Sequence, residues 1–273
     1  MILIDTHCHL DDSAFDPDRE EVLARARMAG VGTLILPGVE PEGIPRVLAL
    51  AERYRGLYAA VGIHPHVAST FSPQILAQLR AWARHPRVVA IGEIGLDFYR
   101  DRSPRPVQRE AFRAQLELAG ELGLPVIIHE REAHEAIMQE LERWIAARPG
   151  ARGVLHAFSG DPGMARIAVA WGFFLGIGGP LTYPRAEGLW AAVRAVGLDG
   201  LVLETDAPYL PPQPYRGRRN EPAYLRDVAE ALAQLLGLPV AHIAQQTTAN
   251  ACRLFRIPQG PEGDPVRSLL RDP

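Results

Sequence analysis

The chain has 273 residues, 47% hydrophobic and 22% charged, which is the composition of an ordinary globular protein rather than a disordered one. Its formal net charge of −3 at pH 7 excludes a global positive field that would attract nucleic acid, so an anionic ligand must be held by a local site. All 29 basic residues are arginine. The absence of lysine excludes a Walker A phosphate loop, a Schiff-base lysine and a carboxylated lysine that bridges metals.

The cellular setting is predicted from the cysteines and from the apolar runs. Two cysteines, Cys8 and Cys252, form no disulfide framework in a chain of this length, so a cytoplasmic location is expected. The N-terminal run Met1–Asp5 is too short for a signal peptide. The most membrane-like stretch, Ile167–Leu181, contains four glycines and falls short of the ~20 residues that span a bilayer. We expect no membrane contact and, because no apolar patch is evident, a monomer.

Short apolar runs rich in β-forming residues alternate with amphipathic stretches along the whole chain. Two of these stretches, Arg19–Met28 and Val107–Leu122, show the periodicity of helices, and the second has Pro106 near its start and Gly123 just past its end. The eight predicted strands are Ile2–Asp5, Thr33–Leu36, Leu57–Gly62, Val88–Gly92, Pro125–His129, Gly153–His156, Phe173–Gly178 and Leu201–Glu204.

Eight β–α repeats predict an α/β fold, the (β/α)8 or TIM barrel. A doubly wound open sheet is the alternative, but no Gly-x-Gly-x-x-Gly turn follows the first strand. No linker divides the chain, so residues 1–257 are expected to form one barrel domain. The proline-dense segment Pro208–Pro214 is predicted to be an ordered loop over the barrel mouth, and residues 258–273 a flexible C-terminal tail.

Six ionisable residues lie at the C-terminal ends of predicted strands. His7 and His9 follow the first strand, and their spacing places both on one face, with Cys8 on the other. The remaining four are Glu93 after the fourth strand, His129 and His156 at the ends of the fifth and sixth, and Asp206 after the eighth. In a barrel these strand ends meet at one face, which carries the active sites of such enzymes.

Four imidazoles and two carboxylates at one mouth predict a divalent-metal centre. If Glu93 bridges, two ions such as Mg²⁺, Mn²⁺ or Zn²⁺ each receive three or four protein ligands and keep positions open for water and substrate. A lone histidine at a strand end is more often a hydrogen-bonded structural residue, but six such residues together favour metal. Glu204 is expected to orient a ligand from behind, or alternatively to be a buried carboxylate paired with an arginine.

Substrate contacts are expected from loops around the mouth. His64 and His66 either contact substrate or orient a metal ligand, and Arg131 is either a phosphate clamp or a solvated helix residue. Backbone amides of Ser159 and Gly160, predicted to open a helix, could bind phosphate. The candidate contacts are His64, His66, Arg131, Ser159, Gly160, Tyr209, whose ring could stack on a base, and Arg219.

Six motifs, read in order, resemble the TatD family of metal-dependent deoxyribonucleases over residues 1 to about 257. A further motif, Arg219-Asn-Glu-Pro222, adds to the resemblance. The six are Asp5-Thr-His-Cys-His-Leu-Asp11, Gly62-Ile-His-Pro-His66, Ile91-Gly-Glu-Ile-Gly-Leu-Asp97, Pro125-Val-Ile-Ile-His129, His156-Ala-Phe-Ser-Gly160 and Glu204-Thr-Asp-Ala-Pro-Tyr209.

The resemblance implies a barrel of the metallo-dependent hydrolase type and metal-dependent hydrolysis of DNA, often from the 3′ end. The implied ligand sets are His7, His9, Glu93 and Asp206 for one metal, and Glu93, His129 and His156 for the other. Three features depart from the family pattern: a lysine common after strand seven is absent, Arg218 stands where lysine is common, and Glu130 follows a presumed ligand.

The predicted function is therefore a divalent-metal-dependent deoxyribonuclease, a 3′–5′ exonuclease on single-stranded or frayed DNA. A hydroxide between two metals would attack phosphorus, Glu93 would bridge the metals, and Asp206 would orient or deprotonate the nucleophile. The alternative is a metal-dependent amidohydrolase or esterase acting on a small cyclic amide, lactone or ester. Four arginines near the mouth favour an anionic polymer over a small neutral ring: Arg131, Arg216, Arg218 and Arg219. A binding module without activity is a third reading, which the open metal positions disfavour.

Overall fold

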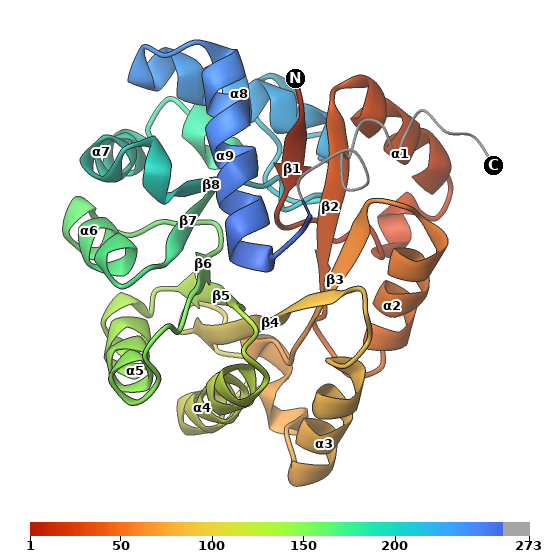
Figure 1. Cartoon of the computed structure of the whole chain (residues 1–273), viewed down its shortest axis with the longest axis vertical. Coiled ribbons are helices and arrows are strands. Elements are labelled where there is room, and N and C mark those ends of the chain that lie inside the picture. The colour runs from red at the N-terminus through yellow and green to blue at the C-terminus, as the bar shows by residue number, and fades with distance from the viewer. Residues whose placement is uncertain (259–273) are drawn as a thin grey trace.

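The computed structural model describes residues 1–258 and shows eight parallel strands in sequence order around a barrel (Figure 1). The last strand returns to the first, where the Thr6 amide donates to the Leu203 carbonyl and the Asp206 amide to the His7 carbonyl. The strands are β1 (Leu3–Asp5), β2 (Val31–Pro37), β3 (Leu57–Val61), β4 (Val88–Asp97), β5 (Val126–Arg131), β6 (Gly153–Leu155), β7 (Phe174–Ile177) and β8 (Leu201–Leu203). The predicted (β/α)8 barrel is confirmed.

At least one helix follows each strand, and the helices surround the barrel (Figure 1). They are α1 (Arg19–Met28), α2 (Ile44–Arg53), α3 (Pro73–Trp82), α4 (Arg105–Leu122), α5 (His134–Ala147), α6 (Pro162–Ala170), α7 (Glu187–Val196), α8 (Leu225–Leu236) and α9 (Val240–Phe255). Within residues 1–258, none of the helices has the length and apolarity needed to cross a bilayer. The predicted tail, apart from Pro258, lies outside the described residues.

One buried residue from each strand forms a layer inside the barrel, which we call the inner layer. The helix α9 closes the barrel below this layer with residues such as Leu254 and Phe255, and Figure 1 shows it crossing that end. The inner layer consists of Ile4, Ile35, Ala60, Ala90, Ile127, Val154, Phe174 and Val202. The interior is therefore packed rather than open, and the strand ends on the far side carry the chemistry.

The outer core, between strands and helices, supplies much of the stability. Phe112 of α4 is 1% exposed within it. Phe112→Ala is expected to lower the free energy of unfolding by about 3–5 kcal/mol, because burial is lost and a cavity remains. Chemical denaturation followed by circular dichroism would measure the change. Glu117→Ala, a change at a half-exposed position of the same helix, should cost under ~1 kcal/mol; similar losses in both would contradict this packing.

Candidate metal centre

Strand alternation carries three polar side chains into the mouth of the barrel. Side chains two residues apart on a strand share a face, so the residue two positions beyond an inner-layer member also points inward. In β5, at the end of β6 and at the end of β8 these residues are His129, His156 and Glu204. The matching position on β7 is Gly176, where a side chain would collide with the Glu204 carboxylate. The sequence thus builds a polar tier directly above the apolar one.

Glu93 reaches the same mouth through an irregularity in β4. We expected it to follow the strand, but β4 continues to Asp97 and Glu93 lies inside it. Simple alternation from Ala90 would turn Glu93 outward; the pairing with β5 shifts register between Ile91 and Ile94, and this shift lets Glu93 face inward. Its side chain is 3% exposed. β5 likewise runs past His129, to Arg131.

Four donor atoms converge at the entrance side of this mouth. The Nε2 atoms of His7 and His9 lie 3.2 Å apart. The Glu93 Oε2 atom is 3.3 Å from the first of these nitrogens and 3.8 Å from the second, and the Asp206 Oδ1 atom is 3.8 Å and 3.4 Å from them. A tetrahedral cation with bonds of about 2.1 Å separates its ligand atoms by about 3.4 Å. His7, His9 and Glu93 therefore have the spacing of donors to one divalent ion, and Asp206 lies beside both histidines. Cys8 packs in the outer core.

The second carboxylate oxygen of Glu93 faces another group of histidines. Its Oε1 atom is 2.8 Å from Nδ1 of His129 and 3.4 Å from Nε2 of His64. Glu93 therefore has the geometry of a carboxylate between two metal positions. His129, His64 and His66 place ligand atoms within 4.8 Å of one another, which is a donor set suited to a second cation.

His156 lies nearer to the first cluster than the implied ligand sets suggest. Its ring stacks on that of His7 with centroids 3.5 Å apart, and its Nε2 is 3.7 Å from the Asp206 Oδ1 atom. The structure groups it with His7 and Asp206. The grouping of Glu93, His129 and His156 around one metal remains a prediction, because only the first two of these are brought into contact.

The carboxylates of the mouth raise the pKa values of two of its histidines. Burial lowers the pKa of His156, but the Glu204 carboxylate, 3.0 Å away, outweighs burial and helps raise the pKa to about 10. Burial likewise opposes protonation of His129, yet hydrogen bonds to Asp97 and Glu93 raise its pKa to about 9. Both imidazoles consequently carry an extra proton at pH 7 in the metal-free protein, and bound metal has to displace it.

Metal affinity is therefore expected to rise with pH from 6 to about 9, by about tenfold per unit for each proton displaced. The sign follows from the raised pKa values of His129 and His156, since protonated imidazole does not ligate. Calorimetric titration with Zn²⁺ in buffers of different ionisation enthalpy would count the protons released. An affinity that does not change across this range would contradict the expectation.

The candidate substrate residues occupy different depths of the mouth. His64 is buried, and burial lowers its pKa to about 4, which keeps it neutral. His66 lies further out, and its Nε2 is 2.7 Å from the Asp97 carboxylate. Arg131 is exposed at the end of β5 and stacks over the ring of Tyr99, 4.2 Å from the centroid. The structure thus makes Arg131 a strand-end residue on an aromatic neighbour rather than a helix residue.

Three other candidates differ from the sequence expectation in their surroundings. Ser159 and Gly160 do not open a helix, because α6 begins at Pro162 and the Asp161 side chain caps it by accepting from the Met164 amide. The Arg219 guanidinium pairs with both oxygens of the Asp18 carboxylate, at 2.7 Å each. These contacts give Arg219 an anchoring role in the loop after β8.

Tyr209 and Glu130 have clear orientations. The Tyr209 side chain is 53% exposed beside His9, with ring centroids 5.8 Å apart, so it stands at the rim of the mouth. The Glu130 carboxylate turns away from the mouth. It accepts a hydrogen bond from the Ala133 amide and lies 2.6 Å from Nδ1 of His134. Glu130 therefore fixes the segment that precedes α5, and its carboxylate points away from the metal centre.

Sequence reasoning missed Asp97, which is buried at the end of β4. Its Oδ2 atom lies 3.2 Å from Nε2 of His129 as well as 2.7 Å from Nε2 of His66. The signal was present, because Asp97 stands in one of the quoted motifs. The sequence predicts that the fourth strand ends at Gly92, whereas β4 ends five residues later, at Asp97. Asp97 was therefore not counted among the residues at strand ends.

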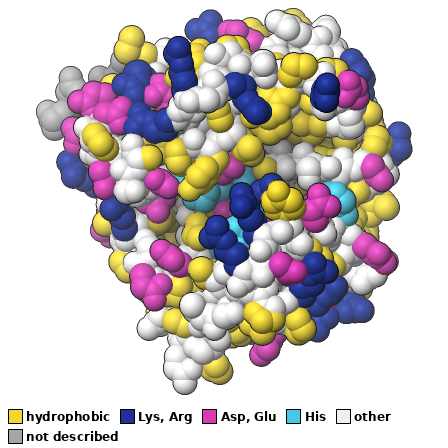
Figure 2. Space-filling model, turned by 180° about the vertical axis from the view of Figure 1, so that it is seen from behind, with side chains coloured by type: hydrophobic (Ala, Val, Ile, Leu, Met, Phe, Trp, Pro, Cys, Tyr) yellow, Lys and Arg dark blue, Asp and Glu magenta, His cyan; other side chains and the backbone are white. Residues whose placement is uncertain are grey.

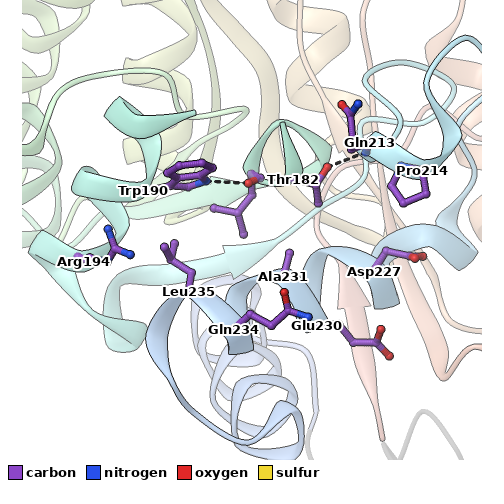
Figure 3. A pocket seen from close by; sticks show the side chains of 11 residues that line it. Thr182, Trp190, Arg194, Gln213, Pro214, Asp227, Glu230, Ala231, Gln234 and Leu235 are labelled. Atoms are coloured by element: carbon purple, nitrogen blue, oxygen red, sulfur yellow. Dashed lines mark hydrogen bonds between the residues drawn. The ribbon is translucent and has the colours of Figure 1, made fainter. Parts of the chain in front are cut away.

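The mouth face differs in character from a second hollow on the side of the barrel. Figure 2 shows histidine side chains gathered in a central depression of the mouth face with arginines beside them. This second hollow, one of several on the molecule and about 560 Å³ in volume, lies between the loops after β7 and β8 and the helices α7 and α8 (Figure 3). Asp227 and Glu230 line it opposite Arg194, and none of its lining residues is a site candidate. We therefore locate the chemistry at the mouth.

Comparisons with known proteins agree with this geometry. The family model for TatD-related DNases matches residues 4–256. An uncharacterized metal-dependent hydrolase of Bacillus subtilis, YabD, is 41% identical over 94% of this chain and 100% of its own length. The 3′–5′ ssDNA/RNA exonuclease TatD of Cronobacter sakazakii is 43% identical over 93% of this chain and 97% of its own.

Solved structures show the same fold. The crystal structure of YjjV, a TatD homologue from Escherichia coli, superposes with a TM-score of 0.88 at 41% identity, covering 94% of this chain and 98% of that one. A phosphotriesterase homology protein from Escherichia coli, with phosphate in its active site, superposes with a TM-score of 0.68 at 16% identity, over 93% of this chain and 98% of that one. The second likeness concerns the barrel alone.

Proposed function

The chain belongs to the family of TatD-related DNases, and on that premise we propose that it is a two-metal nuclease that removes nucleotides from the 3′ end of single-stranded or frayed DNA. The observation that carries the proposal is the placement of Glu93, whose two carboxylate oxygens face two separate histidine groups. A carboxylate in this position can bind two divalent ions at once, and paired ions stabilise the attacking and leaving oxygens in phosphodiester hydrolysis.

The side chains of the mouth have distinct roles in this proposal. His7, His9 and Asp206 would hold one divalent ion with Glu93, and His129 would hold a second ion with the other oxygen of Glu93. The ions, when bound, lower the pKa of water and polarise the phosphoryl oxygen. Asp206 orients the attacking water and accepts its proton, because its carboxylate lies at the rim of the first donor cluster.

A nucleic-acid strand fits the rim better than a small neutral ring does. Arg131 over Tyr99 offers a positive charge against a 57%-exposed aromatic ring on one side of the mouth. Tyr209 offers a second exposed ring on the other side, beside His9. Aromatic rings that accept stacked bases, together with a cation for phosphate, are typical of single-strand binding. A lactone or cyclic amide has no use for these groups.

The decisive experiment uses metal-stripped protein and single-stranded DNA labelled at its 5′ end. Mg²⁺ or Mn²⁺ added back should produce a ladder of products that shorten progressively from the 3′ end. The same oligonucleotide with a 3′-phosphorothioate linkage serves as the matched control and should resist shortening. Products from scattered internal cuts would show that the protein is an endonuclease and not an exonuclease. No cleavage of DNA or RNA, together with turnover of a lactone or aryl ester, would overturn the proposal.

A further inference from the structure

Asp97 is the hub of a hydrogen-bond network behind the metal centre, and none of the roles described above uses it. One of its carboxylate oxygens, Oδ1, accepts from the backbone amides of Tyr99 and Arg100, at 3.0 and 2.7 Å. The other, Oδ2, lies between the Nε2 atoms of His66 and His129.

The backbone on either side of this carboxylate is fixed as well. The Gln108 side chain of α4 accepts from the Asp97 amide at 2.9 Å and donates to the Asp97 carbonyl at 3.1 Å. Gln108 is buried and also donates to the Ser103 carbonyl. Neither carboxylate oxygen can therefore rotate freely, and the orientation of Asp97 is set before any ligand arrives.

An ionised carboxylate at this place determines which nitrogen of His129 carries the proton. In the metal-free protein each ring nitrogen of His129 faces a carboxylate, Nδ1 that of Glu93 and Nε2 that of Asp97. When a cation displaces the proton from Nδ1, Oδ2 of Asp97 can only accept, and it keeps the remaining proton on Nε2. Resting on the two-metal function above, we propose that Asp97 is the positioning residue of the second metal, through the tautomer and orientation of His129. Carboxylate–histidine–metal triads act in this way in other proteins.

A second histidine of the mouth also lies beside a buried carboxylate, at ion-pair distance and without the hydrogen-bond geometry of the His129–Asp97 pair. The Glu204 Oε1 atom lies 3.0 Å from Nδ1 of His156, which leaves Nε2 of that ring toward the Asp206 carboxylate. The two histidines at the ends of β5 and β6 are thus each backed by a buried carboxylate, on opposite ring nitrogens. Asp97 does for His129 what Glu204 was expected to do for a ligand.

Asp97→Asn tests the proposal sharply because the backbone amides decide how asparagine sits. The amides of Tyr99 and Arg100 require an acceptor at the Oδ1 position, so the asparagine nitrogen must take the place of Oδ2 and donate there. It then favours His129 with the proton on Nδ1, the nitrogen that should hold metal. Zinc affinity at the second site is expected to fall about 10- to 100-fold.

The readouts are independent of nuclease activity. Calorimetric Zn²⁺ titration gives the affinities, and long-range ¹H–¹⁵N spectra of the nine histidines, assigned with His129→Gln, give the tautomer. In the zinc-loaded parent, His129 should carry its proton on Nε2. In Asp97→Asn at a zinc concentration that leaves the second site empty, the proton should lie on Nδ1. Asp101→Asn, a change in an exposed carboxylate paired with Arg105, is the control and should leave both unchanged.

The outcomes separate the possible failures. An Nδ1 proton on His129 in the zinc-loaded parent overturns the proposal without any variant, and so does an Asp97→Asn protein that binds zinc like the parent. His66→Ala, which removes the other partner of Oδ2, should leave the proton of His129 on Nε2 in the zinc-loaded protein; a proton on Nδ1 there would show that the effect passes through His66. Failure to cleave DNA with the expected tautomer present would overturn the nuclease function and leave this inference standing.

Discussion

Glu93→Ala is expected to reduce bound metal from about two ions per chain to at most about one and to abolish hydrolysis. Both consequences follow from one carboxylate whose oxygens lie 3.3 Å from Nε2 of His7 and 2.8 Å from Nδ1 of His129. Removing it deprives both donor groups of an anionic ligand. It also removes the negative charge that offsets the charge of cations bound by the neighbouring imidazoles.

Elemental analysis of dialysed protein measures the metal content, and the end-labelled DNA assay measures hydrolysis. Glu93→Gln is the matched variant, because an amide keeps the shape and one oxygen acceptor but loses the charge. It should retain more metal than the alanine variant and still lose most activity. Glu117→Ala, at a half-exposed position of α4, controls for the handling of the protein. An alanine variant with the metal content of the parent would exclude Glu93 as the bridge.

Much of the barrel and of its mouth could be predicted from the sequence because parallel strands impose a simple geometry. Short apolar runs repeat eight times, and in a barrel all their C-terminal ends meet. His129 and His156 lie two positions beyond inner-layer residues, so alternation alone turns them inward. The i, i+2 spacing of His7 and His9 has the same logic, and Cys8 between them packs outward.

The errors occurred where local backbone departs from regular alternation. Strand β4 shifts register between Ile91 and Ile94, and sequence periodicity contains no sign of such a shift. The extension of β4 to Asp97 could therefore not be predicted, and neither could the contact between the Asp97 carboxylate and His129. Helix starts were equally hard to locate: the segment after β6 reads as a helix start from Ser159, but the Asp161 cap sets it at Pro162.

The partners of the arginine side chains could not be predicted from the sequence either. Sequence showed arginines after the strands but not which of them meet carboxylates. Arg219 pairs with Asp18, about 200 positions away in the chain, whereas Arg131 rests on Tyr99 with its charge toward solvent. Long-range ion pairs depend on how loops fold over the mouth, and composition carries no information about that. The distinction matters, because only an arginine free of carboxylates offers its full charge to a phosphate.

Asp206→Asn is expected to lower kcat about 10²- to 10⁴-fold while leaving the fold intact. The backbone of Asp206 has φ +58°, in the left-handed region that asparagine and aspartate adopt more readily than most residues. Its amide still donates to the His7 carbonyl, the link between β8 and β1. The melting temperature should therefore stay close to that of the parent.

The loss should be chemical because the carboxylate of Asp206 meets the reacting side of the mouth. Its Oδ1 atom lies 3.4 Å from Nε2 of His9 and 3.7 Å from Nε2 of His156, within the first donor cluster. An amide in its place can neither accept a proton from water nor supply a negative charge to the first cation. Metal at the second position should remain bound in Asp206→Asn, in contrast to the alanine variant of Glu93.

Cleavage of DNA by Asp206→Asn at the parental rate would refute the role of Asp206 as base. Loss of both ions would instead make it a ligand on which the whole centre depends.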